Sequence, residues 1–153
     1  MSDNFQVQIR PAKITDMKAL LDLIKELAVY ENAAEQVTNN VSQLEIDCFS
    51  DKPAFECLVA ERGDEIVGFA LFFPVYSTWK GSCLYLEDIC VREQLRRKGI
   101  GKKLFDAVLE IAQIRNMKRL SWQVLDWNES AISFYKKYKT EFDSSWINCR
   151  IVL

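Results

Sequence analysis

The pattern in this sequence that could most directly do chemistry is a basic stretch with two glycines, residues 96–101 (RRKGIG). It follows a run of β-forming residues that ends near Val91, and a helical pattern begins at Gly101. Glycines let a backbone turn tightly and approach a ligand closely, and the free N–H groups at a helix start attract an anion. The spacing is neither GxxxxGK[ST] nor GxGxxG, which disfavours nucleotide hydrolysis and dinucleotide binding. The stretch therefore indicates a phosphate cradle, with a solvated basic turn at a helix start as the alternative.

A second feature is an acidic residue, Glu87, inside an otherwise apolar strand-like run, residues 84–91, just before the basic stretch. The chain has no histidine, so proton transfer has to use a carboxylate, a thiolate, a tyrosinate or a chain of water molecules. Glu87 is the best placed of these groups to act as a general base. The alternative is a carboxylate on a solvated strand face. Because Asp88 is adjacent, strand alternation is expected to turn one of the two side chains the other way.

The segment from Glu26 to Asp51 is acidic and contains no lysine or arginine. Its acids are Glu26, Glu31, Glu35, Glu45, Asp47 and Asp51. Such a field draws a cationic ligand, just as a basic loop draws an anionic one. The alternative is that these residues form two solvated helix faces.

Composition narrows the classes of function. The 153 residues include 20 basic and 22 acidic side chains, and the resulting net charge of −2 disfavours a general nucleic-acid-binding protein. Without histidine, Ser–His and Cys–His nucleophile pairs and imidazole-dependent metal sites are excluded, and we expect no metal. The five cysteines are odd in number and lack a CxxC pair, so reduced thiols are expected, with Cys57, Cys83 and Cys90 in apolar runs. Together with the lack of any apolar run near the ~18 residues of a membrane span, this predicts a cytoplasmic protein without a membrane partner.

Hydrophobic periodicity predicts the elements that must position these residues. We expect strands over residues 5–10, 55–61, 65–74, 82–91, 120–125 and, as a pair, 142–153; helices are expected over 17–30, 41–49, from 101 onward and over 130–138. Thr15 is the expected N-cap of the first helix, and Arg62-Gly63-Asp64 is a turn signal that makes a hairpin of the second and third strands. Antiparallel strands lead and βαβα units follow. This order predicts one domain, residues 1–153, with a mixed sheet of the α/β or α+β class.

The basic stretch resembles the signature of the GNAT family of N-acetyltransferases, [RQ]xxGx[GA], whose three fixed positions match Arg96, Gly99 and Gly101. Further segments resemble the diamine (spermidine/spermine) acetyltransferase branch of that family, in particular its thialysine-type members. These segments are residues 9–11, 27–31, 76–81, 85–88, 124–128 and 134–136, in the family's order. The resemblance implies a mostly antiparallel twisted sheet flanked by helices, with acetyl-CoA as the acetyl donor and no metal.

The resemblance also assigns residues to acetyl-CoA. In the family, the amides of the loop hold the pyrophosphate, and the end of the preceding strand pairs with the pantetheine arm. The corresponding residues here are Ile89, Cys90, Val91, Arg96, Arg97, Lys98, Gly99, Ile100, Gly101, Lys102, Asn128, Ser130, Ala131 and Tyr135. For Asn128 the alternative is a role as N-cap of the last helix, and both roles are compatible.

On the acceptor side, the resemblance implies contacts with an amine. The residues concerned are Tyr30, Glu31, Trp79, Glu87, Trp122 and Gln123. Glu87 is then the residue that deprotonates the amine through water, and Tyr135 the residue that protonates the departing thiolate. For Tyr135 the alternative is a core aromatic beside Phe134 and Tyr138. Tyr30 or Trp79 could hold an alkylammonium group by cation–π contact.

We therefore predict an acetyl-CoA-dependent N-acetyltransferase that acts on the primary amine of a small cationic molecule by direct transfer in a ternary complex. Thialysine, another lysine-like amine, a diamine and a polyamine stay open as acceptors. The polyamine-acetylating members have an aspartate where Ser77 stands, which favours a shorter or amino-acid-like amine. A protein or peptide acetyltransferase and a non-catalytic CoA-binding sensor are the alternatives, and the presence of both Glu87 and Tyr135 argues against the sensor. A homodimer is expected from the resemblance alone.

Overall fold

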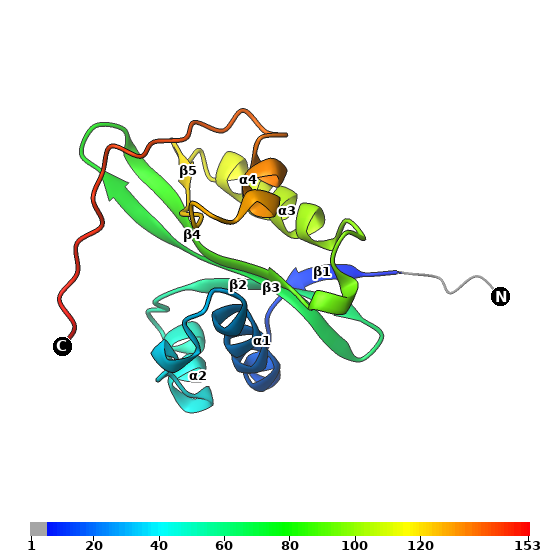
Figure 1. Cartoon of the computed structure of the whole chain (residues 1–153). Coiled ribbons are helices and arrows are strands. Elements are labelled where there is room, and N and C mark those ends of the chain that lie inside the picture. Colours follow the sequence, from blue (N-terminus) through cyan, green and yellow to red (C-terminus); the bar gives the residue numbers. More distant parts are fainter. Residues whose placement is uncertain (1–5) are drawn as a thin grey trace. The chain divides into compact units, whose positions relative to one another are not determined.

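The computed structural model describes residues 6–153, which form two compact units: one ends at Trp122 and the other begins at Gln123. The strands of the described chain belong to the first unit (Figure 1). They are β1 (Gln8–Pro11), β2 (Glu56–Arg62), β3 (Glu65–Ser77), β4 (Gly81–Val91) and β5 (Leu120–Ser121). The strand order follows the chain; β1 to β4 pair antiparallel, and β5 pairs parallel to β4. The predicted mixed, mostly antiparallel sheet is confirmed, and Phe5 of the first predicted strand lies outside the described residues.

Helices cover both faces of this sheet. Helices α1 (Met17–Tyr30) and α2 (Val41–Phe49) lie on one face, and α3 (Ile100–Ile114) lies on the other (Figure 1). The second unit contains α4 (Glu129–Tyr135). Short 3₁₀ turns, η1 (Ile14–Asp16), η2 (Ala34–Gln36) and η3 (Glu93–Leu95), lie between the larger elements. The predicted helices over residues 17–30 and 41–49 are confirmed to the residue. The predicted hairpin is also confirmed, with Gly63 in its turn at φ 60°, although its strands cover residues 56–62 and 65–77 and not 55–61 and 65–74.

The start of α1 differs from the prediction, because the N-cap is Asp16 and not Thr15. Thr15 lies inside the 3₁₀ turn, and the Asp16 carboxylate accepts a hydrogen bond of 2.7 Å from the Lys13 N–H. The same carboxylate pairs with Arg10 of β1 at 2.8 Å, and Arg10 also pairs with Glu61 of β2 at 2.9 Å. The N-cap residue of α1 is therefore part of a long-range ion network that joins it to β1 and β2.

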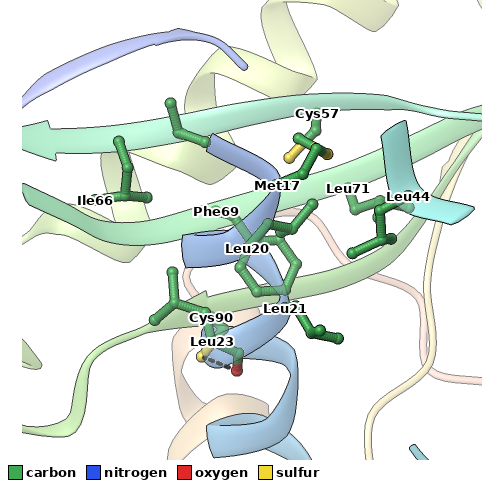
Figure 2. Close-up of a cluster of buried hydrophobic side chains, with 11 residues drawn as sticks. Met17, Leu20, Leu21, Leu23, Leu44, Cys57, Ile66, Phe69, Leu71 and Cys90 are labelled. Carbon is green, nitrogen blue, oxygen red and sulfur yellow. Dashed lines mark hydrogen bonds between the residues drawn. The ribbon is translucent and has the colours of Figure 1, made fainter. Parts of the chain in front are cut away.

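The core between α1 and the sheet holds this part of the fold together. Figure 2 shows the side chains of α1 directed at β3 and β4, with Phe69 and Cys90 among their partners. Leu20 and Leu23 are completely buried there, and full burial of such a side chain contributes about 1.5–3 kcal/mol. The amphipathic spacing of α1 thus fixes the helix against the two strands that carry the candidate site.

The C-terminal part of the chain departs most from prediction. The strand predicted over residues 120–125 is only two residues long, and the helix predicted over 130–138 covers Glu129–Tyr135. Residues 142–153 contain no strand, so the predicted strand pair is wrong. The segment has β-forming residues such as Trp146 and Ile147, but they are 72% and 88% exposed. A strand needs a neighbouring strand to pair with, and the unit from Gln123 onward has none.

Within residues 6–153, no helix is both long enough and apolar enough to cross a bilayer.

Candidate active site

The loop between β4 and α3 has the backbone geometry of an anion site. Gly99 is the N-cap of α3 and has φ 79°, in the left-handed region that suits glycine. The first backbone hydrogen bond into the helix runs from the Lys103 N–H to the Gly99 carbonyl at 3.1 Å. The N–H groups of residues 100–102 therefore have no partner in the preceding turn, as at any helix start. A Cβ atom at Gly99 would meet nothing within 4 Å, so the space beside the loop is open. These features fit the phosphates of a CoA-type donor.

The basic side chains around this loop have different environments. Arg97 has φ 60°, and it and Lys98 are exposed. Lys102 is exposed and pairs with Asp106 one turn along α3. Arg96 is different: its Nε donates to the Val91 carbonyl at 3.1 Å, and its guanidinium lies 4.7 Å from the centre of the Tyr30 ring. The guanidinium of Arg96 is thus engaged with α1.

A β-bulge in β4 places the candidate base. Leu71 of β3 lies opposite Asp88, and the next residue, Phe72, lies opposite Leu86. Glu87 is therefore the extra residue of the bulge, and its side chain is exposed. Bulges bend a strand and redirect its side chains, and they are frequent beside active sites. The structure thus presents Glu87 to solvent beside the buried Leu86, on the stretch of β4 that leads into the loop.

Asp88, the neighbour of Glu87, is the functional candidate that sequence reasoning missed. Burial is the main cause that raises the pKa of Asp88 to about 6, and the nearby carboxylates of Glu87 and Glu31 raise it further. Burial also raises the pKa of Glu31, the C-cap residue of α1. The pKa of Tyr85 is raised by burial and by both acids of β4. Titratable groups shifted in this way are concentrated at functional sites. A signal in the sequence could have found Asp88, since it belongs to the segment 85–88 that resembles the family. Strict strand alternation, however, predicts that Asp88 points away from the side on which Glu87 lies.

The end of β4 has a free edge on one side. β5 pairs with β4 only at Leu84 and Tyr85, so Ile89, Cys90 and Val91 lie beyond the part of β4 that β5 covers. The Cys90 side chain is buried, 4% exposed, and points into the α1 core (Figure 2). Its thiol is thus not placed to contact a ligand along this edge. A Cβ atom at Gly101 would lie 3.9 Å from the Val91 side chain, so the strand end and the helix start adjoin.

Two of the predicted acceptor residues lie elsewhere in the first unit. Trp79 is in the turn between β3 and β4 and is 82% exposed. That turn is closed by the Ser77 hydroxyl, which accepts hydrogen bonds from the N–H groups of Trp79 and Lys80. Glu87 lies six residues after Gly81 in β4, about 20 Å in an extended strand. Trp122 packs edge-on against buried Phe105 of α3, with ring centres 5.1 Å apart. The structure therefore brings Glu31, the neighbour of Tyr30, near Asp88 in the stretch of β4 that carries Glu87, whereas Trp79 lies beyond the other end of that strand.

The remaining predicted residues belong to the second unit. Asn128 is the N-cap of α4, and its side chain accepts from the Ala131 N–H at 3.2 Å, so the capping alternative is confirmed. Ser130 and Ala131 form the first turn of this helix. Tyr135 is its last residue, with its ring 5.2 Å from that of Phe134. Gln123 is exposed and donates to Asn148 at 2.6 Å.

Among residues 6–153, no three His, Cys, Asp or Glu side chains are grouped as ligands for a metal ion.

Comparison with known proteins supports the resemblance found in the sequence. A thialysine N-epsilon-acetyltransferase of Bos taurus is 42% identical over 138 residues, which are 85% of this chain and 81% of that protein. A spermidine/spermine N(1)-acetyltransferase-like protein 1 of Homo sapiens is 36% identical over 135 residues, 84% of this chain and 19% of that longer protein. The crystal structure of an aminoglycoside acetyltransferase from an uncultured soil sample shares the fold, with a TM-score of 0.80 at 20% identity over 100% of this chain and 99% of that one. The model of the acetyltransferase (GNAT) family matches residues 18–139. The chain therefore belongs to the GNAT family of acetyltransferases.

Proposed function

We propose that this protein transfers the acetyl group of acetyl-CoA to the primary amine of a small cationic molecule. The observation that carries the proposal is a contrast in charge along one segment of the chain. The carboxylates of Glu87 and Asp88 lie in β4, and a loop with basic side chains and open backbone amides follows at the start of α3. Carboxylates attract an ammonium group and amides at a helix start attract phosphate, so both substrates of such a transfer have a complementary place. The curated relatives, named for thialysine and for spermidine/spermine, support an amine acceptor of this class.

The transfer needs a deprotonated amine. A primary alkylamine has a pKa of about 10, so it is protonated at neutral pH and has to lose a proton before it attacks. Glu87 is exposed at the bulge, where it can accept that proton through water. The amine nitrogen then forms a bond to the acetyl carbonyl carbon, and the carbon–sulfur bond breaks. The products are the N-acetylated amine and CoA.

Direct transfer is favoured over an acetyl-cysteine intermediate. Cys90 is the cysteine of β4 nearest the loop, but it is buried, and burial with the nearby carboxylate of Glu26 raises its pKa to about 12. The thiolate is the nucleophilic form of cysteine, so this thiol is unreactive at neutral pH. We therefore propose that both substrates are bound together and react without a covalent enzyme intermediate.

Acetyl-CoA fits the residues at the end of β4 and the start of α3. The amides of residues 100–102 would hold its pyrophosphate, and the exposed side chains of Arg97 and Lys98 would add positive charge. Backbone groups of residues 89–91 on the edge that β5 does not cover would pair with pantetheine, apart from the Val91 carbonyl, which already accepts from Arg96. What acetyl-CoA supplies is an activated acetyl group on a thiolate leaving group. In the second unit, Asn128, Ser130 and Ala131 are proposed to contact the same arm.

The two compact units are proposed to work as one N-acetyltransferase domain. The match to the family model runs from residue 18 to residue 139 and so includes parts of both units. The five cysteines are unpaired, which supports a reducing, cytoplasmic compartment. A homodimer is proposed on family resemblance.

A panel of amines tests the proposed function. Release of the CoA thiol from acetyl-CoA would be followed with thialysine, lysine, ornithine, putrescine and spermidine, and with an acetylatable lysine peptide as comparison. We expect faster release with one of the small amines than with the peptide, and a mass increase of one acetyl group on that amine. A preference for the peptide, or acetyl-CoA binding without release by any acceptor, would contradict the proposal.

The role proposed for Tyr135 has its own test. If the phenol protonates the departing thiolate, Tyr135→Phe should lower kcat with little change in either KM, because the hydroxyl matters mainly in the transition state. The expected loss is about 10²-fold or more. Phenylalanine keeps the ring that contacts Phe134, so a ring that serves only packing predicts nearly unchanged turnover. Steady-state kinetics at saturating acetyl-CoA decide between the two.

A further inference from the structure

Helix α1 holds the segment that leads from β4 into the glycine loop, residues 92–96, at two points. The first point is Glu26. Its carboxylate accepts a hydrogen bond of 2.9 Å from the Glu93 N–H and lies 3.6 Å from the guanidinium of Arg92. Glu93 begins the 3₁₀ turn η3, so α1 anchors the turn at its first residue.

The second point is Tyr30, four residues after Glu26 and so on the same face of α1. The Arg96 guanidinium lies 4.7 Å from the centre of its ring, within the range of a cation–π contact. Arg96 is held in this place by its hydrogen bond to the Val91 carbonyl at 3.1 Å. Tyr30 is also the last residue of α1, where the partial negative charge of a helix end favours a cation.

Arg96 immediately precedes Arg97, which has a left-handed backbone at φ 60°. Gly99, two residues further on, has the same kind of backbone at φ 79°, and these two residues shape the loop around Lys98. The backbone of such a short loop is set by where its ends are held. The Tyr30 ring therefore acts on the amides that begin α3 through the position of Arg96, without a contact of its own to a ligand there.

Tyr30 is equally part of the acceptor side. It adjoins Glu31, whose carboxylate acts on the pKa of Asp88, the neighbour of Glu87. The ring is 38% exposed, so one part of it packs against the protein and another part faces solvent. One side chain thus lies between the carboxylates that attract an amine and the arginine that leads into the loop.

We propose that Tyr30 is a positioning residue that couples the two substrate sites: by stacking on Arg96 it holds the glycine loop in its acetyl-CoA-binding form. This inference rests on the proposed function for the identity of the two substrates. Because coupling between two binding sites is reciprocal, acetyl-CoA also holds Tyr30 in place for the amine, and each substrate raises the affinity of the other.

The test is the Kd of acetyl-CoA, measured by isothermal titration calorimetry on the full chain without any amine. Tyr30→Leu removes the ring of the stacked pair. Arg96→Lys keeps the charge but removes the planar guanidinium, together with its hydrogen bond to the Val91 carbonyl. Each should weaken acetyl-CoA binding by about two- to fivefold, the range of a partly exposed cation–π contact. The double variant should bind acetyl-CoA no more weakly than Arg96→Lys alone, since that change already breaks the stacking contact that Tyr30→Leu removes. Tyr30→Phe keeps the ring and should bind like wild type.

Val29→Ala is the matched control, because Val29 is 64% exposed and one residue away on the same helix. It should leave the Kd of acetyl-CoA unchanged. If Tyr30→Leu does not fold, Tyr30→Met provides an unbranched apolar replacement for the same measurement. A Tyr30→Leu protein with wild-type acetyl-CoA affinity, or additive losses in the double variant, would overturn the proposal. An effect on the KM of the amine alone would also overturn it, because Tyr30 would then act only on the acceptor. Failure of the wild-type protein to bind acetyl-CoA would instead count against the proposed function.

Discussion

The glycine loop and the nearby group of carboxylates offer a ligand different parts of the chain: backbone amides in the loop and side chains in the carboxylate group. The loop, residues 96–101, offers backbone amides, and its form depends on glycine at position 99 and on the start of α3. The carboxylate group, Glu31, Glu87 and Asp88, offers side chains from two segments more than 50 residues apart in sequence. A backbone site is sensitive to added side-chain volume, whereas a side-chain site is sensitive to the identity and charge of each residue.

The two regions also differ in exposure, and therefore in energetic cost. Arg97 and Lys98 of the loop are exposed, so water solvates their charges. Asp88 is half-buried among other acids, and its ionised form is disfavoured by that burial. The carboxylate group therefore lowers the stability of the fold, as groups of polar residues at functional sites commonly do.

The largest effect is expected from changing the carboxylate at the bulge. Glu87→Gln removes the proton acceptor but keeps the size of the side chain, so kcat/KM for the amine should fall by ~10²–10⁴-fold. The loss should shrink as the pH rises, because solution then supplies more neutral amine. Acetyl-CoA affinity should stay unchanged, since the loop is built from other residues.

Glu110→Gln is the matched control for Glu87→Gln, because Glu110 is an exposed acid on α3 outside the site. The pH–rate profiles of both variants and wild type, with the Kd of acetyl-CoA, make the comparison. A Glu87→Gln enzyme with a wild-type rate and profile would show that the base is another group.

A smaller effect is expected from Asp88, seen in stability. Its folded pKa of about 6 lies above the ordinary value of 3.8, so the folded state binds the proton more tightly than the unfolded state. The free energy of unfolding should therefore fall as the pH rises from about 4 through 6 and then level off. Asp88→Asn cannot ionise and should remove this component, raising stability by about 3 kcal/mol at neutral pH.

Urea denaturation of Asp88→Asn and wild type at about pH 4.5 and pH 7.5 measures that difference directly. The charged groups that act on Asp88 are Glu87 and Glu31, so Glu31→Gln should reduce the effect in part. Equal stability of wild type and Asp88→Asn at the higher pH would contradict the assignment of an electrostatic cost to this residue.

The loop was predictable from sequence for a physical reason, namely that its pattern is local. Glycines and the helix start lie within six residues of one another, and the apolar period that follows defines α3. The same holds for α1, α2 and the hairpin around Gly63, where periodicity and turn residues decide the structure over short distances.

The features that prediction missed depend on partners distant in sequence. The bulge that exposes Glu87 is a property of two strands in register, and no pattern in β4 alone marks it. The N-cap residue of α1, Asp16, pairs with Arg10, which in turn pairs with Glu61, 51 residues further along the chain. Residues 142–153 have the composition of a strand but no strand to pair with. Contacts between distant segments therefore limit what the sequence predicts of the acceptor side.

The smallest of the three effects, and the one most specific to the loop, is expected at Gly101. Its Cβ position lies 3.9 Å from the Val91 side chain, an ordinary contact, so Gly101→Val should fold without strain from its neighbours. The valine side chain would stand over the end of β4, where pantetheine and the pyrophosphate have to come close to the backbone. Acetyl-CoA affinity should fall about tenfold, with a smaller loss for Gly101→Ala, because bulk beside the amides is what matters.

This change tests the contrast between the two regions because it leaves every carboxylate in place. The KM of the amine at saturating acetyl-CoA should therefore stay close to wild type, while the Kd of acetyl-CoA measured by calorimetry rises with side-chain volume. A folded Gly101→Val protein with unchanged acetyl-CoA affinity would mean that the donor does not approach the start of α3. The open amides there would then belong to an ordinary helix start that binds no donor. The assignment of the donor to backbone amides and of the amine to side chains would be wrong.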